Sequence, residues 1–373
     1  MTAMPDIRLP DELTPRDGRF GSGPSKVAVA GLTALAETGA SYLGTSHRQP
    51  TVRNVVGDIR AAMTALYSLP DGYEVVLGVG GATAFWDAAA FGLIDAKSQH
   101  LSFGEFSSKF AKVAAGAPHL AEPEIIQTDP GSHPTPEARS DIDVYALTHN
   151  ETSTGVMMPI IRPDGADGLV AVDATSAAGA APLDPQQCDV YYFSPQKALG
   201  SEGGLWVALM SPDAIARIEM LGRSDRWIPP FLALDAAVAN SRKNQTYNTP
   251  SLATIFLLRH QLNRMLENGG LEWGITRSTT SSSCVYEWAE ASEIAYPFVA
   301  DTSMRSITVA TVDLIDDYDA DTVEAVLRSN GILDTGGYRK LGRNQLRISC
   351  FPNVDPADVA RLTAAIDYIV ERL

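Results

Sequence analysis

Between residues 74 and 210 seven short apolar segments recur, each of a length typical of a buried strand. Helical patterns fill several of the intervals, such as Ala82 to Leu93 and Ser107 to Ala115. This alternation predicts an α/β fold whose large domain has a mostly parallel seven-stranded sheet flanked by helices. In chain order the seven segments read EVVLGVG, HLSF, EIIQT, DVYALTH, LVAVDA, DVYYFS and GLWVALM.

A smaller unit is expected after the sheet region. Apolar residues at helical spacing over 252–266 run into Asn268-Gly269-Gly270, which is a strong helix stop. We therefore expect a large domain over residues 17–266 and a small α+β C-terminal domain over residues 267–373, with residues 1–16 packing on the small domain. The elements expected in the small domain are a helix rich in Ser and Thr, a strand at 307–314, a helix near 320–329, a strand at 345–351 and a final helix that begins at Asp355-Pro356.

Charge and composition exclude several classes of function. The formal net charge of −16 argues against nucleic acid or an anionic membrane as a partner, because like charges repel. Cys188, Cys284 and Cys350 are widely spaced and form no C-x-x-C pair, so neither disulfides nor a metal site are expected. No signal peptide and no run of about 18 apolar residues is present, which favours a cytoplasmic protein without a membrane span.

Polar residues follow four of the expected strands at the point where each strand ends. They are Gly80-Gly81-Ala82, His149-Asn150-Glu151-Thr152, Asp173 and Ser194-Pro195-Gln196-Lys197. Because sites in parallel sheets collect at the carboxyl ends of the strands, we expect all four groups to meet at one edge of the sheet.

Lys197 and Asp173 suggest cofactor chemistry. Lys197 follows Asp173 by 24 residues, beyond a further strand. A carboxylate beside a pyridine nitrogen and a lysine amine that forms an imine are what pyridoxal phosphate (PLP) requires. The glycines at 80 and 81 could present backbone N–H groups to its phosphate at a helix start. By itself, however, a lysine after a strand is more often a solvated surface residue.

Six motifs in order resemble those of the phosphoserine aminotransferases, a family of fold type I PLP enzymes in the class V aminotransferase group. The similarity covers essentially the whole chain. It implies reversible transfer of an amino group between glutamate and 3-phosphohydroxypyruvate, giving O-phospho-L-serine and 2-oxoglutarate in serine biosynthesis. Relatives also act on 4-phosphohydroxythreonine in pyridoxine biosynthesis. The motifs are SHR at 46–48, GGA at 80–82, HNET at 149–152, VDATS at 172–176, SPQKALG at 194–200 and YNTPS at 247–251.

The resemblance also implies a role for each cofactor-binding residue. Lys197 would carry PLP as an imine, Asp173 would pair with the pyridinium nitrogen, and Thr152 would bind the phenolic oxygen. Phe106 stands where many relatives stack a tryptophan on the ring. A homodimer with shared active sites is implied, because the partner subunit completes the phosphate site. The residues expected around the phosphate are Gly81, Ala82, Thr83 and Gln196, with Asn248 and Thr249 from the partner.

Arginines are expected to hold the substrate, because planar guanidinium groups bind carboxylates and phosphates through two hydrogen bonds. By resemblance, Arg347 would bind the carboxylate, and His47 and Arg48 would meet the phosphate from across the dimer. The sequence departs from the family pattern ahead of Arg347, where Arg339 is our choice for the phosphate and Arg343 is the second candidate.

Three other functions remain open at this point. An alanine-glyoxylate aminotransferase would leave His47, Arg48 and Arg339 without an anion to bind. A cysteine desulfurase needs an exposed nucleophilic cysteine, whereas Cys350 lies in an apolar run. A non-catalytic PLP-binding regulator would normally add a basic DNA-binding module, and the chain has neither spare length nor positive charge for one.

Overall fold

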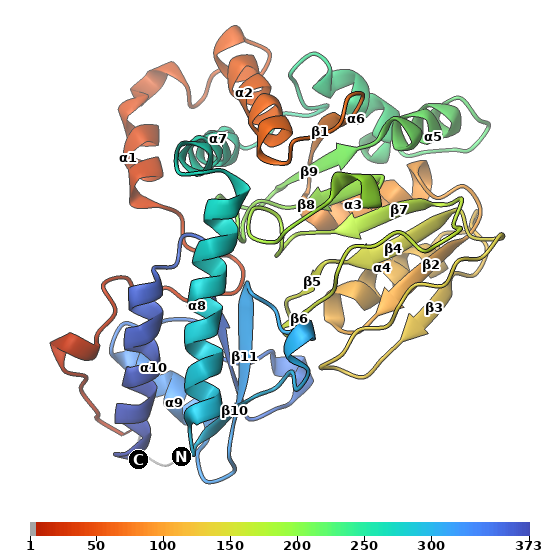
Figure 1. The fold of residues 1–373 in the computed structure, drawn as a ribbon. Coiled ribbons are helices and arrows are strands. Elements are labelled where there is room, and N and C mark those ends of the chain that lie inside the picture. The colour runs from red at the N-terminus through yellow and green to blue at the C-terminus, as the bar shows by residue number, and fades with distance from the viewer. Residues whose placement is uncertain (1–4) are drawn as a thin grey trace.

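A seven-stranded sheet forms the centre of the larger part of the molecule (Figure 1). The computed structural model describes residues 5–373. Four of the strand pairs are parallel, and β9 is antiparallel to both of its neighbours. The prediction of a mostly parallel seven-stranded sheet is therefore confirmed. Across the sheet the strands lie in the order β1 (Glu74–Val79), β9 (Leu205–Met210), β8 (Val190–Phe193), β7 (Leu169–Asp173), β4 (Val144–Thr148), β2 (Ser98–Ser102) and β3 (Glu124–Gln127).

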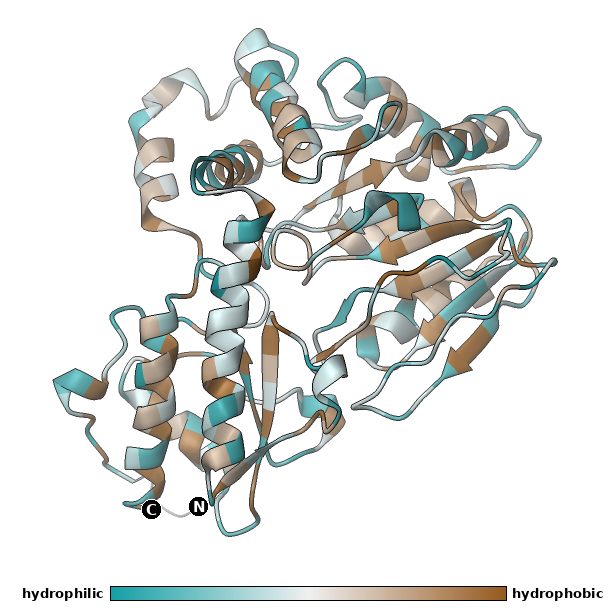
Figure 2. Cartoon of the chain, viewed as in Figure 1, coloured by the Kyte–Doolittle hydropathy of each residue, from teal (hydrophilic) through white to brown (hydrophobic). Residues whose placement is uncertain are grey.

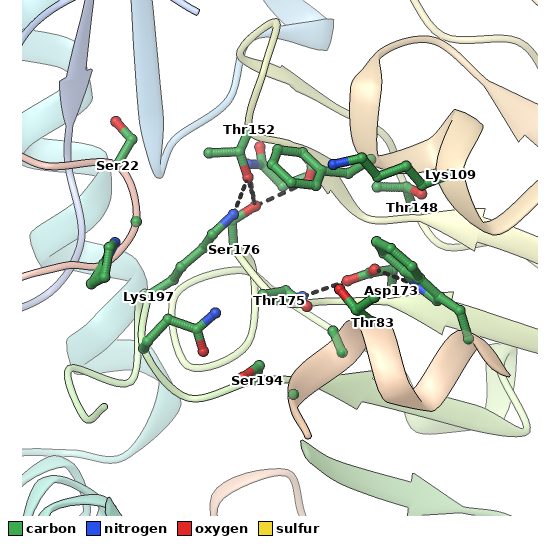
Figure 3. A pocket seen from close by; sticks show the side chains of 18 of the residues that line it. Ser22, Thr83, Lys109, Thr148, Thr152, Asp173, Thr175, Ser176, Ser194 and Lys197 are labelled. Carbon is green, nitrogen blue, oxygen red and sulfur yellow. Dashed lines mark hydrogen bonds between the residues drawn. The ribbon is translucent and has the colours of Figure 1, made fainter. Parts of the chain in front are cut away.

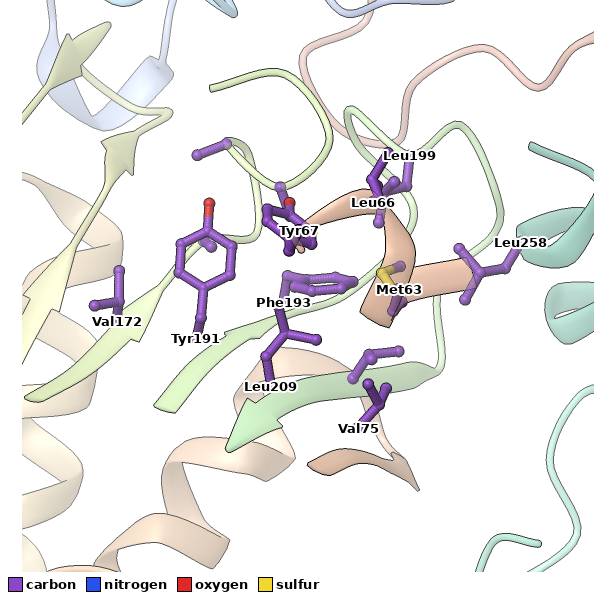
Figure 4. Close-up of a cluster of buried hydrophobic side chains, with 14 of the residues drawn as sticks. Met63, Leu66, Tyr67, Val75, Val172, Tyr191, Phe193, Leu199, Leu209 and Leu258 are labelled. Carbon is purple, nitrogen blue, oxygen red and sulfur yellow. The ribbon is translucent and has the colours of Figure 1, made fainter. Parts of the chain in front are cut away.

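Both faces of this sheet are buried, and Figure 2 shows most of its strands as hydrophobic. Successive side chains of a strand alternate between the faces: Val75 and Leu77 pack in one apolar cluster, and Val76 packs in another. Figure 4 shows part of the first cluster. It is covered by α2 (Pro50–Leu66) and α7 (Leu252–Glu267), whereas the second is covered by α3 (Gly81–Gly92), α4 (Glu105–Gly116), α5 (Pro212–Gly222) and α6 (Leu234–Ser241).

The C-terminal region forms a separate small sheet with its own apolar cluster. Its central strand is antiparallel to both of its neighbours, and three helices pack with the sheet. This agrees with the small α+β unit expected from the sequence. The elements are β10 (Ala295–Pro297), β11 (Val309–Leu314), β12 (Gln345–Ser349), α8 (Leu271–Ala291), α9 (Ala320–Ser329) and α10 (Pro356–Val370).

The N-terminal segment reaches both parts of the molecule before α1 (Val29–Glu37) begins. The backbone N–H of Arg16 donates to Asp358 at the start of α10, and Phe20 is buried in the small cluster. Further along, the N–H of Ser25 donates to the carbonyl of Gln196, beside the large sheet. Residues 1–4 of the segment expected to pack on the small domain lie outside the described residues.

The division of the chain into domains stays our proposal, with residues 17–266 in the large domain and 267–373 in the small one. The long helix α8 crosses between them. Leu271 and Trp273 at its start pack against the large cluster, and Val285 and Tyr286 belong to the small one.

Candidate active site

A cavity of about 410 Å³ lies where four strands end, between the large sheet and the small domain (Figure 3). The carboxyl ends of β1, β4, β7 and β8 point to the same edge of the sheet, since β1 and β8 are both antiparallel to β9. Most of the residues predicted for one subunit's site line this cavity. They are Gly81, Ala82, Thr83, Phe106, Thr152, Asp173, Gln196, Lys197 and Arg347.

Lys197 presents its amine to the cavity although the residue is only 7% exposed. Its Nζ donates to Thr152 Oγ1 at 2.6 Å, and that hydroxyl donates in turn to Ser176 Oγ at 2.9 Å. Burial lowers the pKa of Lys197 to about 8, although the nearby carboxylates of Asp173 and Glu151 act in the opposite direction. The neutral, nucleophilic form of the amine is therefore much more accessible near neutral pH than in an exposed lysine.

We predict that Lys197→Met stabilises the cofactor-free protein at pH 7 while removing the reactive amine. A lysine whose pKa falls from 10.5 to about 8 on folding destabilises the fold by about 3 kcal/mol at every pH below about 8, and the effect disappears as the pH rises to 10.5. Methionine fills similar space without a charge. The substitution also loses the hydrogen bond to Thr152, which offsets part of this effect. We therefore expect the free energy of unfolding in urea to rise by about 2 kcal/mol at pH 7 and by less at pH 10. Equal stability of the two proteins at pH 7 would contradict this account.

Asp173 at the end of β7 is a buried carboxylate with neutral partners. The N–H of Thr175 donates to Oδ1 at 2.9 Å, and Trp86 Nε1 donates to Oδ2 at 3.2 Å. Burial raises the pKa of Asp173. Within residues 5–373 it forms no ion pair, so a buried negative charge faces the cavity without a cation in contact. A protonated ring nitrogen is the kind of group that such a carboxylate stabilises.

The turn between β1 and α3 provides an anion site of backbone N–H groups. Gly80 and Gly81 have φ angles of 109° and 71°, which favour glycine, and no side chain caps the start of α3. The first N–H groups of that helix thus remain available beside the cavity. Nearby, Gln196 also lines the cavity, and the NH₂ group of its side chain is a donor that an anion can accept from. These features fit the phosphate of PLP.

Phe106 and Arg347 close two further sides of the cavity. The ring centroid of Phe106 lies 4.7 Å from Lys197 Nζ, so its face looks toward the amine. Arg347, on β12 of the small domain, donates from Nη1 to the carbonyl of Thr152 at 3.2 Å. Its Nε is buried without a partner in the described part of the chain, and burial lowers the pKa of the guanidinium. The arginine thus retains unused donors for an anionic group.

The structure does not bring the other predicted substrate residues into the cavity. Arg339 lies in the short 3-10 helix η6 (Arg339–Leu341) and lines an outer surface hollow. Arg343 lines the same hollow, and its Nε donates to Asp313 at 2.8 Å. The placement of Arg339 at the phosphate is therefore not reproduced in this conformation, because Tyr338 is the residue of this loop that faces the cavity.

The residues assigned to the partner subunit lie together on the surface of the same subunit. His47 Nδ1 and Thr249 Oγ1 are 3.1 Å apart, and Arg48, Asn248 and Thr249 are exposed. None of these four residues lines the cavity. In their own subunit they therefore lie on the surface, away from Lys197 and Asp173.

Several residues that line the cavity were not predicted from the sequence. Trp86 follows Thr83 by one helical turn of α3, so helical spacing could have identified it. Tyr338 carried no comparable signal. The same is true of Ser22 to Pro24, because this segment reaches the cavity only through contacts distant in sequence. Lys109 lies one turn after Phe106 on α4 and also lines the cavity.

Residues 5–373 contain no group of three or more His, Cys, Asp or Glu side chains placed to hold a metal ion. In the same part of the chain, every helix is too short or too polar to cross a membrane.

The chain belongs to the class V aminotransferase family, whose model matches residues 130–362. Its curated relatives include the phosphoserine aminotransferase of Corynebacterium glutamicum (strain R), which is 58% identical over 97% of each chain. The phosphoserine aminotransferase of Nocardioides sp. is 55% identical over 98% of this chain and 99% of its own. A solved structure of a phosphoserine aminotransferase from Cytophaga hutchinsonii has a TM-score of 0.86 at 25% identity, covering 94% of this chain and 99% of that one.

These similarities confirm the family resemblance and the fold type I architecture expected from the sequence. Pyridoxal 5′-phosphate is the cofactor of this family, and the residues around the cavity fit it. A reactive amine, a buried carboxylate without a cation and a glycine turn with free N–H groups surround one space.

Proposed function

We propose that the chain is a phosphoserine aminotransferase that transfers an amino group between glutamate and 3-phosphohydroxypyruvate, giving O-phospho-L-serine and 2-oxoglutarate in serine biosynthesis. The observation that supports this most strongly is the meeting of Lys197, Asp173 and Arg347 around one cavity. The names of relatives that are more than 50% identical over nearly the whole chain support the same assignment.

Each of these residues has a distinct task in the proposed reaction. When bound, PLP withdraws electrons from the α-carbon of the amino acid. Asp173 would hold a proton on the ring nitrogen. Lys197 Nζ would take the proton from the α-carbon of the amino donor and, in the reverse half-reaction, would deliver a proton to the α-carbon of the amino acid formed. Arg347 orients the substrate carboxylate through its unused donors, while Phe106 covers the ring and excludes water.

The choice of substrate can be tested by comparing amino donors. We expect phosphoserine to exceed serine and alanine by at least about 100-fold in kcat/KM in an assay coupled to 2-oxoglutarate, because a bound phosphate adds charge-assisted hydrogen bonds. Equal rates with alanine and glyoxylate would instead support the alanine-glyoxylate alternative. Bound cofactor with no turnover of any donor would support a regulator. The same assay with phosphohydroxythreonine would reveal the pyridoxine-pathway reaction.

We further propose a homodimer in which the partner subunit supplies His47, Arg48, Asn248 and Thr249 to the phosphate groups of substrate and cofactor. These residues are polar and lie outside the cavity of their own subunit. Arg339 remains our proposal for a further phosphate contact, which requires the loop around η6 to turn inward.

Subunit mixing tests the shared site. Lys197→Ala and Arg48→Ala homodimers should each have low activity, because every site lacks either the amine or the partner's arginine. After the two proteins are unfolded and refolded together, about half of the dimers are mixed, and each mixed dimer has one intact site. We expect recovery of about a quarter of wild-type activity. If refolded mixtures containing both subunits regain nothing, Arg48 does not act across the dimer.

A cytoplasmic location is also proposed. It is supported by the free cysteines, of which Cys188 and Cys350 are buried thiols. Burial raises the pKa of each of these two thiols to about 12, which keeps them in the unreactive protonated form.

A further inference from the structure

Glu151 lies directly behind the cavity and is fully buried, with 0% exposure. Within residues 5–373 it has no ion-pair partner. Five neutral donors satisfy its carboxylate instead. They are the N–H of Phe106 (3.0 Å), the N–H and Oγ of Ser107 (2.9 and 3.0 Å), and the N–H and Oγ of Ser153 (3.2 and 2.7 Å).

These contacts join two segments that face the cofactor cavity. Phe106 and Ser107 lie in the first turn of α4, where backbone N–H groups lack helical partners and attract negative charge. Glu151 itself ends the short strand β5 (Asn150–Glu151), and the next residue is Thr152, which binds the amine of Lys197. One carboxylate therefore sets the distance between the stacking ring and the hydroxyl at the amine.

The fit around this carboxylate is close. A Cβ added at Gly104, the residue before α4, would lie 2.3 Å from Glu151 Cγ and 2.5 Å from its Cδ. Only glycine at this position allows the side chain of Glu151 to reach the first turn of the helix. The close packing of the end of β5 against the start of α4 therefore depends on the glycine in the backbone as well as on the hydrogen bonds of Glu151.

The charge of Glu151 also acts on the cations of the cavity. It raises the pKa of Lys197 and of Arg347, in each case against the larger effect of burial. The other charged groups that act on Lys197 are Asp173, which raises its pKa, and Arg347 and Lys109, which lower it. Glu151 is thus the second negative charge, after Asp173, that offsets the burial of the amine.

We propose that Glu151 is a positioning residue of this active site: its carboxylate holds the ring of Phe106 over the amine of Lys197 and helps to balance the positive charge of the cavity. The role in transamination rests on the proposed function. The two physical effects, on the helix start and on the amine, do not.

Hydrogen–deuterium exchange on the cofactor-free protein tests the first effect. In Glu151→Gln the amide NH₂ or a neutral oxygen faces the helix N–H groups, and in Glu151→Asp the carboxylate retracts by about 1.5 Å. We expect exchange of the Phe106 and Ser107 amides to accelerate by about tenfold or more in both variants. Glu105→Gln is the matched control. Glu105 lies in the same helical turn, but its carboxylate pairs with Lys109 and Lys340 and binds neither amide. We expect its substitution to change the exchange rates of these amides by less than about twofold.

Labelling of Lys197 by 1-fluoro-2,4-dinitrobenzene, read by mass spectrometry across a pH series, tests the second effect. Only the neutral amine reacts. Glu151→Gln should shift the midpoint of labelling to lower pH, whereas Glu151→Asp, which keeps the charge, should stay near wild type. A shifted labelling midpoint in Glu151→Gln alone, together with faster amide exchange in both variants, separates the effect of the charge from the effect of side-chain length.

Unchanged amide exchange in Glu151→Gln and an unchanged labelling midpoint would overturn the proposal. Should both substitutions at 151 prevent folding, Ser153→Ala removes the donor at 2.7 Å while leaving the carboxylate in place. It should then accelerate exchange of the Phe106 amide by a smaller factor, and no acceleration would equally overturn the proposal. Both readouts use protein without substrate. A failure of the phosphoserine assay would therefore be distinguishable from a failure here.

Discussion

Lys197→Ala is expected to reduce transamination by about 10⁴-fold or more, because the substitution removes both the amine that binds the cofactor and the base at the substrate α-carbon. The hydroxyl that contacts Nζ in the wild type, Thr152 Oγ1, is far too weak a base to replace the amine. The measurement is single-turnover transfer from phosphoserine, followed by the absorbance of the bound cofactor. We also expect that cofactor to be removed by dialysis, which covalent attachment prevents in the wild type.

The control for this experiment is Lys112→Ala, an exposed lysine on the outer side of α4. It should retain activity within about twofold, since surface substitutions rarely change local structure. If Lys197→Ala kept even a tenth of the wild-type rate, the amine would not be the base. The assignment of this cavity as the active site would then be wrong.

Asp173→Asn is expected to lower kcat by about 10³-fold while leaving the fold intact. The substitution keeps the size of the side chain and the hydrogen bond from the N–H of Thr175, loses the one from Trp86, and removes the charge that would hold a proton on the ring nitrogen. Loss of one such preorganised electrostatic contact is typically worth about 3 to 4 kcal/mol of the barrier. Steady-state rates with phosphoserine measure the effect on catalysis. An absorbance titration with the cofactor measures separately any effect on cofactor affinity.

Asp87→Asn provides the matched comparison. Asp87 is partly buried, directly follows Trp86 on α3 and does not line the cavity, so it tests the loss of a nearby negative charge alone. We expect a change of less than about threefold. A comparable loss of kcat in the two variants would mean that catalysis depends on the overall negative charge near the site. It would not then depend on direct contact between Asp173 and the cofactor ring.

The sequence predicted the parts of the site that follow from local pattern. Asp173 and Lys197 end successive segments of the predicted sheet, so the rule that parallel strands end at one edge predicts that they lie together, as they do. Glycines 80 and 81 were recognisable because a strand that turns directly into a helix needs positive φ angles. Helical spacing over 82–93, 107–115 and 252–266 predicted α3, α4 and α7, whose observed bounds are 81–92, 105–116 and 252–267.

Contacts distant in sequence were not predictable in the same way. The hydrogen bond of Trp86 to Asp173 and the approach of Tyr338 depend on how a helix and a loop from the small domain pack on the sheet. The conformation of the loop around Arg339 depends on ion pairs, such as that of Arg343 with Asp313, that no periodicity encodes. The short strands β5 and β6 (Val156–Met157) are likewise too brief for a recognisable pattern.

The path of the N-terminal segment sets the order in which the site can be assembled during synthesis. Residues 22–24 form one wall of the cavity, yet Phe20, just before them, receives a hydrogen bond from Ser349 and donates one to Leu333. Both positions are translated after the large domain, so the large domain must emerge and begin to fold before this wall is held in place. The nascent protein therefore cannot complete the wall of its cofactor cavity until the strand that contains Ser349 has been made.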